Sequence, residues 1–155
     1  MHCRIAMATL LLALAGSAGA SAQQDRWTRQ VADRLQRALG AFDTSGTRTM
    51  LRRAGALNGE ETTSFDVTLT AGVTYAIVGV CDDDCRRLHL VLATPTNDEL
   101  AVERRREAFP IIRFTPRATM PYRVRVRMDA CGWNPCRWAV GIVPETAPPA
   151  VGRRR

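Results

Sequence analysis

Two pairs of cysteines are the residues of this sequence with the clearest chemical potential. Cys81 and Cys85 enclose residues 82–84, which are all aspartates, and Cys131 and Cys136 enclose a second short segment. Cysteines this close in sequence form local disulfides in an oxidising compartment, so we predict the bonds Cys81–Cys85 and Cys131–Cys136. Such small loops remove little chain entropy, so each bond is expected to constrain a turn rather than the whole fold. A zinc site of four thiolates is the alternative, because zinc sites use similar spacings.

The three aspartates at 82–84 raise the question of a calcium site. A calcium ion needs about six to eight oxygen ligands, and a short cross-linked turn does not easily point three adjacent carboxylates at one ion. Arg86 and Arg87 follow closely and can neutralise these charges. The sequence therefore favours a cross-linked, arginine-paired turn that holds no metal, with a weak calcium site and an acidic contact surface as the alternatives.

Arginines form the second candidate site. Arg123, Arg125 and Arg127 alternate with apolar residues, which predicts one strand with three guanidinium groups on one face, about 7 Å apart. This spacing is comparable to that of successive phosphates or acidic sugars, which guanidinium groups bind through paired hydrogen bonds. We expect Arg113 to extend this row and Trp133 to add an exposed aromatic contact beside it. The alternative is a solvated face on which acidic residues of neighbouring strands pair with the arginines.

Catalytic and cofactor-binding motifs are not evident in the sequence. It contains no G-x-S-x-G turn, no H-E-x-x-H helix and no glycine loop for phosphate. His89 lies between Leu88 and Leu90, so we expect its imidazole on the outer face of a strand rather than beside a nucleophile. We predict a protein that is not an enzyme and binds no cofactor. A hydrolase with two carboxylates brought together by folding is the remaining enzymatic alternative.

The N-terminus predicts export. A short start that includes Arg4 is followed by the apolar stretch 5–15 and by small residues that end in Ala20-Ser21-Ala22. This is the pattern of a signal peptide, residues 1–22, and its apolar stretch is too short to span a membrane comfortably. We therefore predict an exported protein, periplasmic or secreted, without a transmembrane segment.

The charge of the chain indicates which classes of partner it can bind. The formal net charge is +7, and all 22 basic side chains are arginines because the sequence contains no lysine. Guanidinium groups recognise carboxylates and phosphates through paired hydrogen bonds. For an exported protein we expect an anionic polymer of the envelope or a protein partner, and no nucleic acid. The base composition of the gene is the alternative explanation for the arginines.

Residues 23–46 are expected to form an amphipathic helix and a linker. Asp25 is suited to cap the helix and Gly40 to end it. The apolar stripe of this helix either packs on the rest of the domain or lies on an anionic membrane or a partner as a peripheral contact. The stripe consists of four residues spaced four apart: Trp27, Val31, Leu35 and Leu39.

Residues 47–143 are expected to form the folded domain. Apolar and polar residues alternate in seven to eight short segments separated by turn residues. This period of two predicts strands with one buried face, and hence a mainly β, antiparallel β-sandwich after the helix. We expect the strand at Tyr122–Met128 to form a hairpin with the strand at Trp138–Ile142, and Thr47–Leu57 to add an edge strand. The proline- and arginine-rich tail, residues 144–155, is expected to be disordered.

Three stretches in a fixed order carry a resemblance to a known family: "GALNGEETTSFDVTLTAGVTYAIVGVCDDDCRRLHLVL", "FPIIRFTPRATMPYRVRVRM" and "CGWNPCRWAVGIV". From about Gly55 to Val143 the chain resembles the bacterial pre-peptidase C-terminal domain, in its small secreted stand-alone form. The resemblance implies a jelly-roll-like β-sandwich without catalytic residues, which in some members binds matrix polymers or assists a neighbouring enzyme. Some relatives hold calcium with aspartates where this chain has Arg87-Leu88-His89-Leu90 and the arginine-rich stretch 103–107. These arginines oppose a calcium site.

Two functions remain at the level of the sequence. The first is a non-catalytic exported binding module that recognises an anionic envelope component or a protein partner through its arginine-rich face. The second is a structural or accessory protein that docks a partner through its N-terminal helix and has no ligand of its own.

Overall fold

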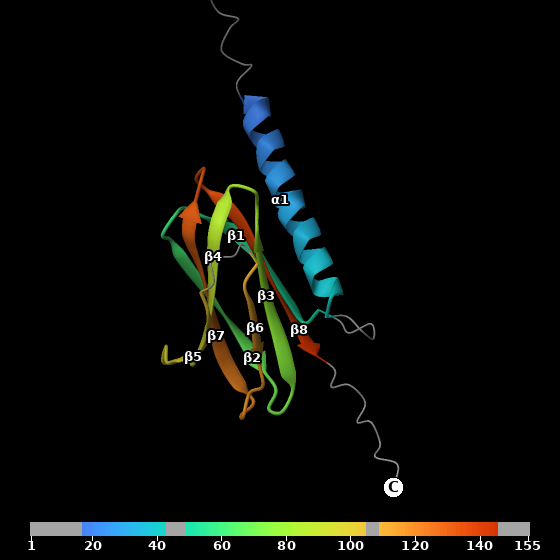
Figure 1. Ribbon diagram of the computed structural model, residues 1–155, viewed down its shortest axis with the longest axis vertical. Helices are drawn as coiled ribbons and strands as arrows, with labels where there is room; N and C mark the ends of the chain where they lie inside the picture. The colour runs from blue at the N-terminus through green and yellow to red at the C-terminus, as the bar shows by residue number, and fades with distance from the viewer. Residues whose placement is uncertain (1–16, 43–48, 105–108, 146–155) are drawn as a thin grey trace, which may run out of the picture.

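The computed structural model describes residues 17–42, 49–104 and 109–145, with side chains from residue 26 onward. Eight strands form two four-stranded antiparallel sheets, and one helix, α1 (Ser17–Gly40), lies against one of them (Figure 1). In the first sheet the order is β1 (Leu51–Leu57), β8 (Cys136–Glu145), β3 (Thr74–Cys81) and β6 (Ile111–Phe114). In the second sheet the order is β2 (Thr62–Leu69), β7 (Met120–Cys131), β4 (Cys85–Ala93) and β5 (Glu99–Glu103).

This strand order confirms the predicted jelly-roll-like sandwich. Successive strands cross from one sheet to the other, except for β4 and β5, which are antiparallel neighbours in the second sheet. The inward-facing residues of both sheets are fully buried, as the period of two requires; examples are Leu69, Ile77, Leu90, Val126 and Ile142.

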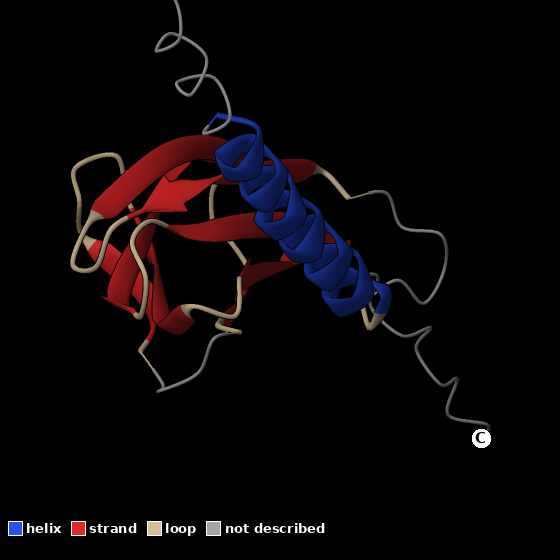
Figure 2. Cartoon of the chain, turned by 90° about the horizontal axis from the view of Figure 1, so that it is seen from above, coloured by secondary structure: helices blue, strands red, loops and turns tan. Residues whose placement is uncertain are grey.

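The helix α1 covers the outer face of the first sheet and crosses its strands obliquely (Figure 2). Val31, Leu35 and Leu39 are at most 3% exposed, and each contributes about 1.5–3 kcal/mol by leaving water. Gly141 of β8 provides room, because a Cβ atom there would lie 2.7 Å from a methyl group of Leu39. The helix residues pack on a patch of small side chains from β3 and β8: Ala76, Val78, Val80, Ala139 and Val143.

This packing decides between the alternatives for the helix. The apolar stripe packs on its own domain, so it is not free to dock a partner or a membrane. It also corrects the expectation that every strand has one buried face: β3 and β8 are buried on both faces because α1 covers the outer one. Trp27 is the least buried residue of the stripe and lies beneath the guanidinium group of Arg26, 5.1 Å from the ring centre.

The ends of the helix were predicted with mixed success. Gly40 ends α1 as expected, but Asp25 does not cap it, because α1 begins at Ser17 and runs continuously through Asp25. Residues 1–16 lie outside the described residues, so the signal peptide stays a prediction. Among the described helical residues, no segment is long and apolar enough to cross a membrane.

The predicted hairpin of the last two strands is wrong. β7 pairs with β2 and β4 in the second sheet, whereas β8 pairs with β1 and β3 in the first. Each strand has one strongly apolar face, and the two faces meet across the core instead of lying side by side in one sheet. β8 also continues to Glu145, two residues beyond the predicted domain boundary, while the tail 146–155 lies outside the described residues.

Candidate functional site

Both predicted disulfides are present. Cys81–Cys85 and Cys131–Cys136 each have an S–S distance of 2.04 Å. The first bond closes the turn from β3 to β4 and the second the turn from β7 to β8, so both turns pass from one sheet to the other. The turns lie side by side, because Cys85 is the strand partner of Cys131. The disulfides therefore hold the two sheets together at one end, a larger role than the local one expected from their short loops.

Asp82 ties the first of these turns to β8. Its side chain is buried, and its two carboxylate oxygens accept hydrogen bonds from the backbone N–H groups of Cys85 (3.2 Å) and Arg137 (2.6 Å). Burial raises the pKa of Asp82 above its ordinary range, and the nearby charge of Asp84 adds to this, while the backbone hydrogen bonds partly oppose it. The Asp82 carboxylate therefore has a structural role: it accepts hydrogen bonds from two backbone N–H groups at the turn that have no strand partner there.

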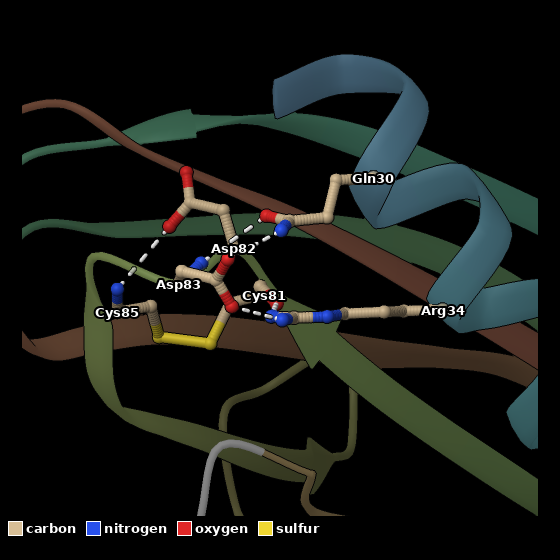
Figure 3. Close-up of polar contacts among 6 residues, drawn as sticks. All are labelled: Gln30, Arg34, Cys81, Asp82, Asp83 and Cys85. Carbon is tan, nitrogen blue, oxygen red and sulfur yellow. Dashed lines mark hydrogen bonds and ion pairs between the residues drawn. A yellow bond between two sulfur atoms is a disulfide. The ribbon is translucent and has the colours of Figure 1, made fainter. Parts of the chain in front are cut away.

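Asp83 ties the same turn to the helix (Figure 3). Its carboxylate forms an ion pair with Arg34 and accepts a hydrogen bond from the side-chain amide of Gln30. The Gln30 carbonyl in turn accepts the backbone N–H of Asp83 (3.2 Å), and Arg34 also donates to the carbonyl of Cys81 (2.7 Å). We call this contact the helix clamp: Gln30 and Arg34 on α1, and Asp83 with Cys81 on the turn.

The helix clamp corrects the predicted partners of the aspartates. The sequence suggested Arg86 and Arg87, but the arginine that pairs with the turn is Arg34, and Arg87 pairs with Asp129 at 3.1 Å. The carboxylate oxygens of Asp82 and Asp83 accept hydrogen bonds from N–H groups, so a calcium ion at this turn would compete with these donors. In the part of the chain that the structure describes, no three His, Cys, Asp or Glu residues are grouped to hold a metal.

The helix clamp makes stability depend on pH in a definite direction. The hydrogen bond from Gln30, and then that from Arg34, lower the pKa of Asp83 below its ordinary value of 3.8. A lowered pKa stabilises the fold above the unfolded value, and this contribution is lost as the pH falls below about 4. We expect Asp83→Asn to lower the free energy of unfolding by about 0.5 kcal/mol at pH 6 and to converge with the parent protein near pH 2, measured by urea unfolding.

Asp82 contributes to the pH dependence of stability with the opposite sign, because its raised pKa favours folding at low pH. Its contribution is expected to be the same in the parent protein and in Asp83→Asn. Subtracting the two pH profiles therefore isolates Asp83. A difference that stays constant from pH 2 to 6 would contradict a role for the charge of Asp83.

The row of arginines on β7 has the predicted geometry. Arg123, Arg125 and Arg127 alternate with fully or nearly buried residues and share the outer face of the second sheet. Each of them is paired with a carboxylate of the same chain, and Asp66 raises the pKa of Arg123. The N···O distances are 3.0 Å for Arg123–Asp66, 2.7 Å for Arg125–Glu99 and 3.4 Å for Arg127–Asp129.

The other predicted site residues lie elsewhere. Arg113 does not extend the row, because β6 belongs to the first sheet, and it pairs there with Glu145 (2.8 Å) and lies over the ring of Phe42. Trp133 is 78% exposed at the tip of the cross-linked turn that follows β7. His89 of β4 lies opposite Arg127 of β7 in the strand register, on the outer face of the second sheet. Its Nε2 atom is buried without a hydrogen-bond partner.

A groove that the sequence did not predict runs between α1 and the edge strand β1. Its volume is about 340 Å³. Apolar and small side chains line it from the helix and from both strands beneath: Val31, Ala32, Leu35, Ala54 and Ala139. Three arginines line it as well: Arg52, Arg53 and Arg137. We call this the α1–β1 groove.

The strand register places two of these arginines at opposite ends of the apolar centre. Ala54 is paired with Ala139, and two residues away on either side Arg52 is paired with Gly141 and Ala56 with Arg137. Arg52 is held by the side-chain oxygen of Gln36 (2.7 Å). Among the described residues, neither Arg52 nor Arg137 has a carboxylate within ion-pair distance. The adjacent residues Arg52 and Arg53 are visible in the sequence as a basic pair. Their proximity to Arg137 could not be predicted, because it depends on the pairing of β1 with β8.

Comparisons with known proteins give matches of fold only. No family model matches the chain, and a search of curated proteins finds no match. One similar solved structure is the pre-peptidase C-terminal domain of collagenase from Bacillus anthracis, with 10% identity, a TM-score of 0.48, and coverage of 59% of this chain and 87% of that one. This is the family that the sequence resembles.

A second similar structure is PliG from Aeromonas hydrophila, a periplasmic inhibitor of g-type lysozyme. It has 13% identity and a TM-score of 0.48, with coverage of 64% of this chain and 88% of that one. At these identities the two matches concern the fold alone.

Proposed function

We propose that the protein is a non-catalytic, exported binding module that recognises an anionic partner through the arginines of the α1–β1 groove. The observation that carries this proposal is the contrast between two sets of arginines. Arg52 and Arg137 flank an apolar centre and have no carboxylate of the described residues within ion-pair distance, whereas the row on β7 is paired within the fold. A paired arginine must exchange one carboxylate for another on binding, so an unpaired one gains more from an anionic partner.

Export is supported by the cysteines. All four cysteines of the folded domain are in disulfides, which persist in the periplasm and outside the cell. The predicted signal peptide, residues 1–22, agrees with this. The protein would therefore meet its partner in the envelope or beyond it.

The non-catalytic part of the proposal is supported by His89. The Nε2 atom of His89 is buried and has no hydrogen-bond partner among the described residues, so no serine or cysteine is in place to give it a proton. The alternative role, docking through the apolar stripe of the helix, loses its support because that stripe is buried in the domain. The row on β7 together with exposed Trp133 remains a second candidate surface, and the following experiment separates it from the groove.

We expect polyglutamate to raise the melting temperature of the oxidised mature protein, residues 23–155, by several degrees at low salt, with a smaller shift at moderate salt. Heparin serves as a second polyanion, whose sulfates test whether the site prefers carboxylates. In the double variant Arg52→Gln, Arg137→Gln the shift should be lost, measured against the variant's own baseline. The matched control Arg123→Gln, Arg127→Gln also removes two charges and should keep it.

Two results would overturn this assignment. Absence of any shift with either polyanion would contradict an anionic partner. Loss of the shift only in the Arg123→Gln, Arg127→Gln variant would place binding on β7 instead of in the groove.

A further inference from the structure

We infer that the α1–β1 groove binds an extended acidic segment of a partner protein, which pairs with the free edge of β1 as an additional strand of the first sheet. This inference rests on the proposed function and specifies its partner. It is argued from the edge of the sheet, the spacing of the arginines and the charge of the chain.

The outer edge of β1 carries no strand among the described residues, although the carbonyl of Arg52 accepts a hydrogen bond from the guanidinium group of Arg53 (3.1 Å), which an added strand would have to displace. β8 occupies one side of β1, and no strand in the described part of the chain pairs with the other side. Arg52, Arg53 and Ala54 are exposed at this edge, and Ala54 forms the floor of the groove. An edge strand presents a row of unpaired N–H and C=O groups, which an incoming extended segment can satisfy.

The groove specifies the side chains of such a segment. In an added strand, side chains two residues apart point to the same face, about 7 Å from each other. An apolar side chain beside Ala54 would enter the groove against Val31 and Leu35. Acidic side chains two residues before and after it would lie near Arg52 at one end and near Arg137 at the other. Ala56 is small, so Arg137 can reach across it from β8.

The predicted motif is therefore acid, any residue, apolar, any residue, acid. The two intervening side chains would point to the opposite face of the sheet. There they would meet the guanidinium group of Arg53, a residue that borders the groove but whose guanidinium group lies over the ring of Phe65, 6.0 Å from its centre. That face accepts polar or acidic residues.

Charge argues for a foreign acidic segment rather than a second copy of this chain. Two β1 edges brought together would place Arg52 and Arg53 of one copy against those of the other. The chain carries a net charge of +7, which adds a general repulsion. Arginines on an edge strand commonly prevent self-association, and the same charges favour an acidic strand.

The test uses a fluorescent peptide with blocked ends, whose centre reads glutamate, threonine, leucine, threonine, glutamate between threonine flanks. Binding to the oxidised mature protein, residues 23–155, is followed by anisotropy at low salt, with a dissociation constant expected in the micromolar range, about 1–100 μM. A control peptide of the same composition moves the leucine by one position, so that it points away from the two glutamates. We expect it to bind about tenfold more weakly.

A second peptide tests strand pairing directly. Methylation of its backbone nitrogens at alternate residues, in two versions that block opposite edges, should abolish binding in one version and leave it in the other. Amide hydrogen exchange of residues 51–57 should slow when the unmodified peptide binds. Both measurements report backbone hydrogen bonding between the peptide and β1, and neither depends on the charge of the side chains.

Charge reversal tests the arginines without relying on a destabilised core. In Arg52→Glu, Arg137→Glu we expect affinity for the glutamate peptide to fall at least tenfold, and a peptide with lysines in place of the glutamates to bind better than it does to the parent. The control Arg117→Glu changes one exposed arginine in the loop between β6 and β7, and it should leave affinity within about twofold.

The outcomes separate this inference from the proposed function. If polyglutamate still binds through Arg52 and Arg137 but neither methylated peptide loses affinity, strand pairing is wrong while the anionic groove stands. If the control peptide binds as well as the patterned one, the motif is wrong. If neither polyglutamate nor the peptide binds, both proposals fall.

Discussion

Replacing Leu35 by aspartate is expected to lower the free energy of unfolding by about 4 kcal/mol or more and to abolish binding in the α1–β1 groove. Removing a buried leucine side chain alone costs about 2–5 kcal/mol, and a carboxylate without a partner adds to this. Leu35 is 3% exposed and packs beside Gly141 on the outer face of the first sheet. It also lines the groove, so the same change removes one of its walls.

Urea unfolding followed by tryptophan fluorescence measures this effect. Leu35→Met keeps the volume and should cost less than about 1.5 kcal/mol. Arg37→Asp places the same acidic group on the exposed side of the helix and should change stability by about 0.5 kcal/mol or less. A Leu35→Asp protein as stable as Arg37→Asp would mean that α1 is not docked on the sheet.

The variant also shows how far the sandwich depends on the helix. If the helix and the sandwich unfold as one unit, Leu35→Asp shifts a single transition. If the sandwich is stable alone, helical signal should be lost at lower urea than tryptophan fluorescence changes. Whether one or two unfolding transitions are seen, we expect Leu35→Asp to lose binding in the groove.

Reduction of both disulfides is expected to lower the free energy of unfolding by about 4 kcal/mol, which is about 2 kcal/mol for each bond. The magnitude follows from loops whose ends are separated by 4 and 5 residues. Because the two cross-linked turns pass between the sheets at one end of the sandwich, the loss concerns the association of the sheets as well as the turns. Urea unfolding with and without reductant measures it.

Two double variants measure the contribution of each disulfide separately. Cys131→Ser, Cys136→Ser should cost about 2 kcal/mol. Cys81→Ser, Cys85→Ser should cost more, because the first turn also holds Asp83 in place for Gln30 and Arg34. Equal losses in the two variants would contradict a role of the first disulfide in seating the helix. Stability unchanged by reductant in the parent protein would contradict both.

Much of the fold was predictable from local patterns. The period of two located the strands, including the edge strand near Leu57, and the spacing of Val31, Leu35 and Leu39 located the helix. The close cysteine pairs indicated their bonds. All these features depend on neighbours in the sequence, because the geometry of a helix or strand decides which side chains share a face.

The partners of those faces depend on tertiary structure. The sequence showed that Arg123, Arg125 and Arg127 share one face, but Asp66 and Glu99 reach them only because β2 and β5 belong to the same sheet. Arg34 could not be assigned to Asp83 before the helix was placed. Similarly, β8 looked like a hairpin partner of β7 because the two strands are adjacent in sequence.

The sequence by itself determined the helix and the strands, one apolar face of each, and the close cysteine pairs that form the two cross-links. Only the tertiary structure decided which strands are neighbours, which of the described arginines lie apart from the described carboxylates, and that a groove forms beside β1. The physical reason is the range of the interactions. Periodicity and short loops act over a few residues, whereas the order of the strands and the position of α1 follow from burying all the apolar faces of the chain at once.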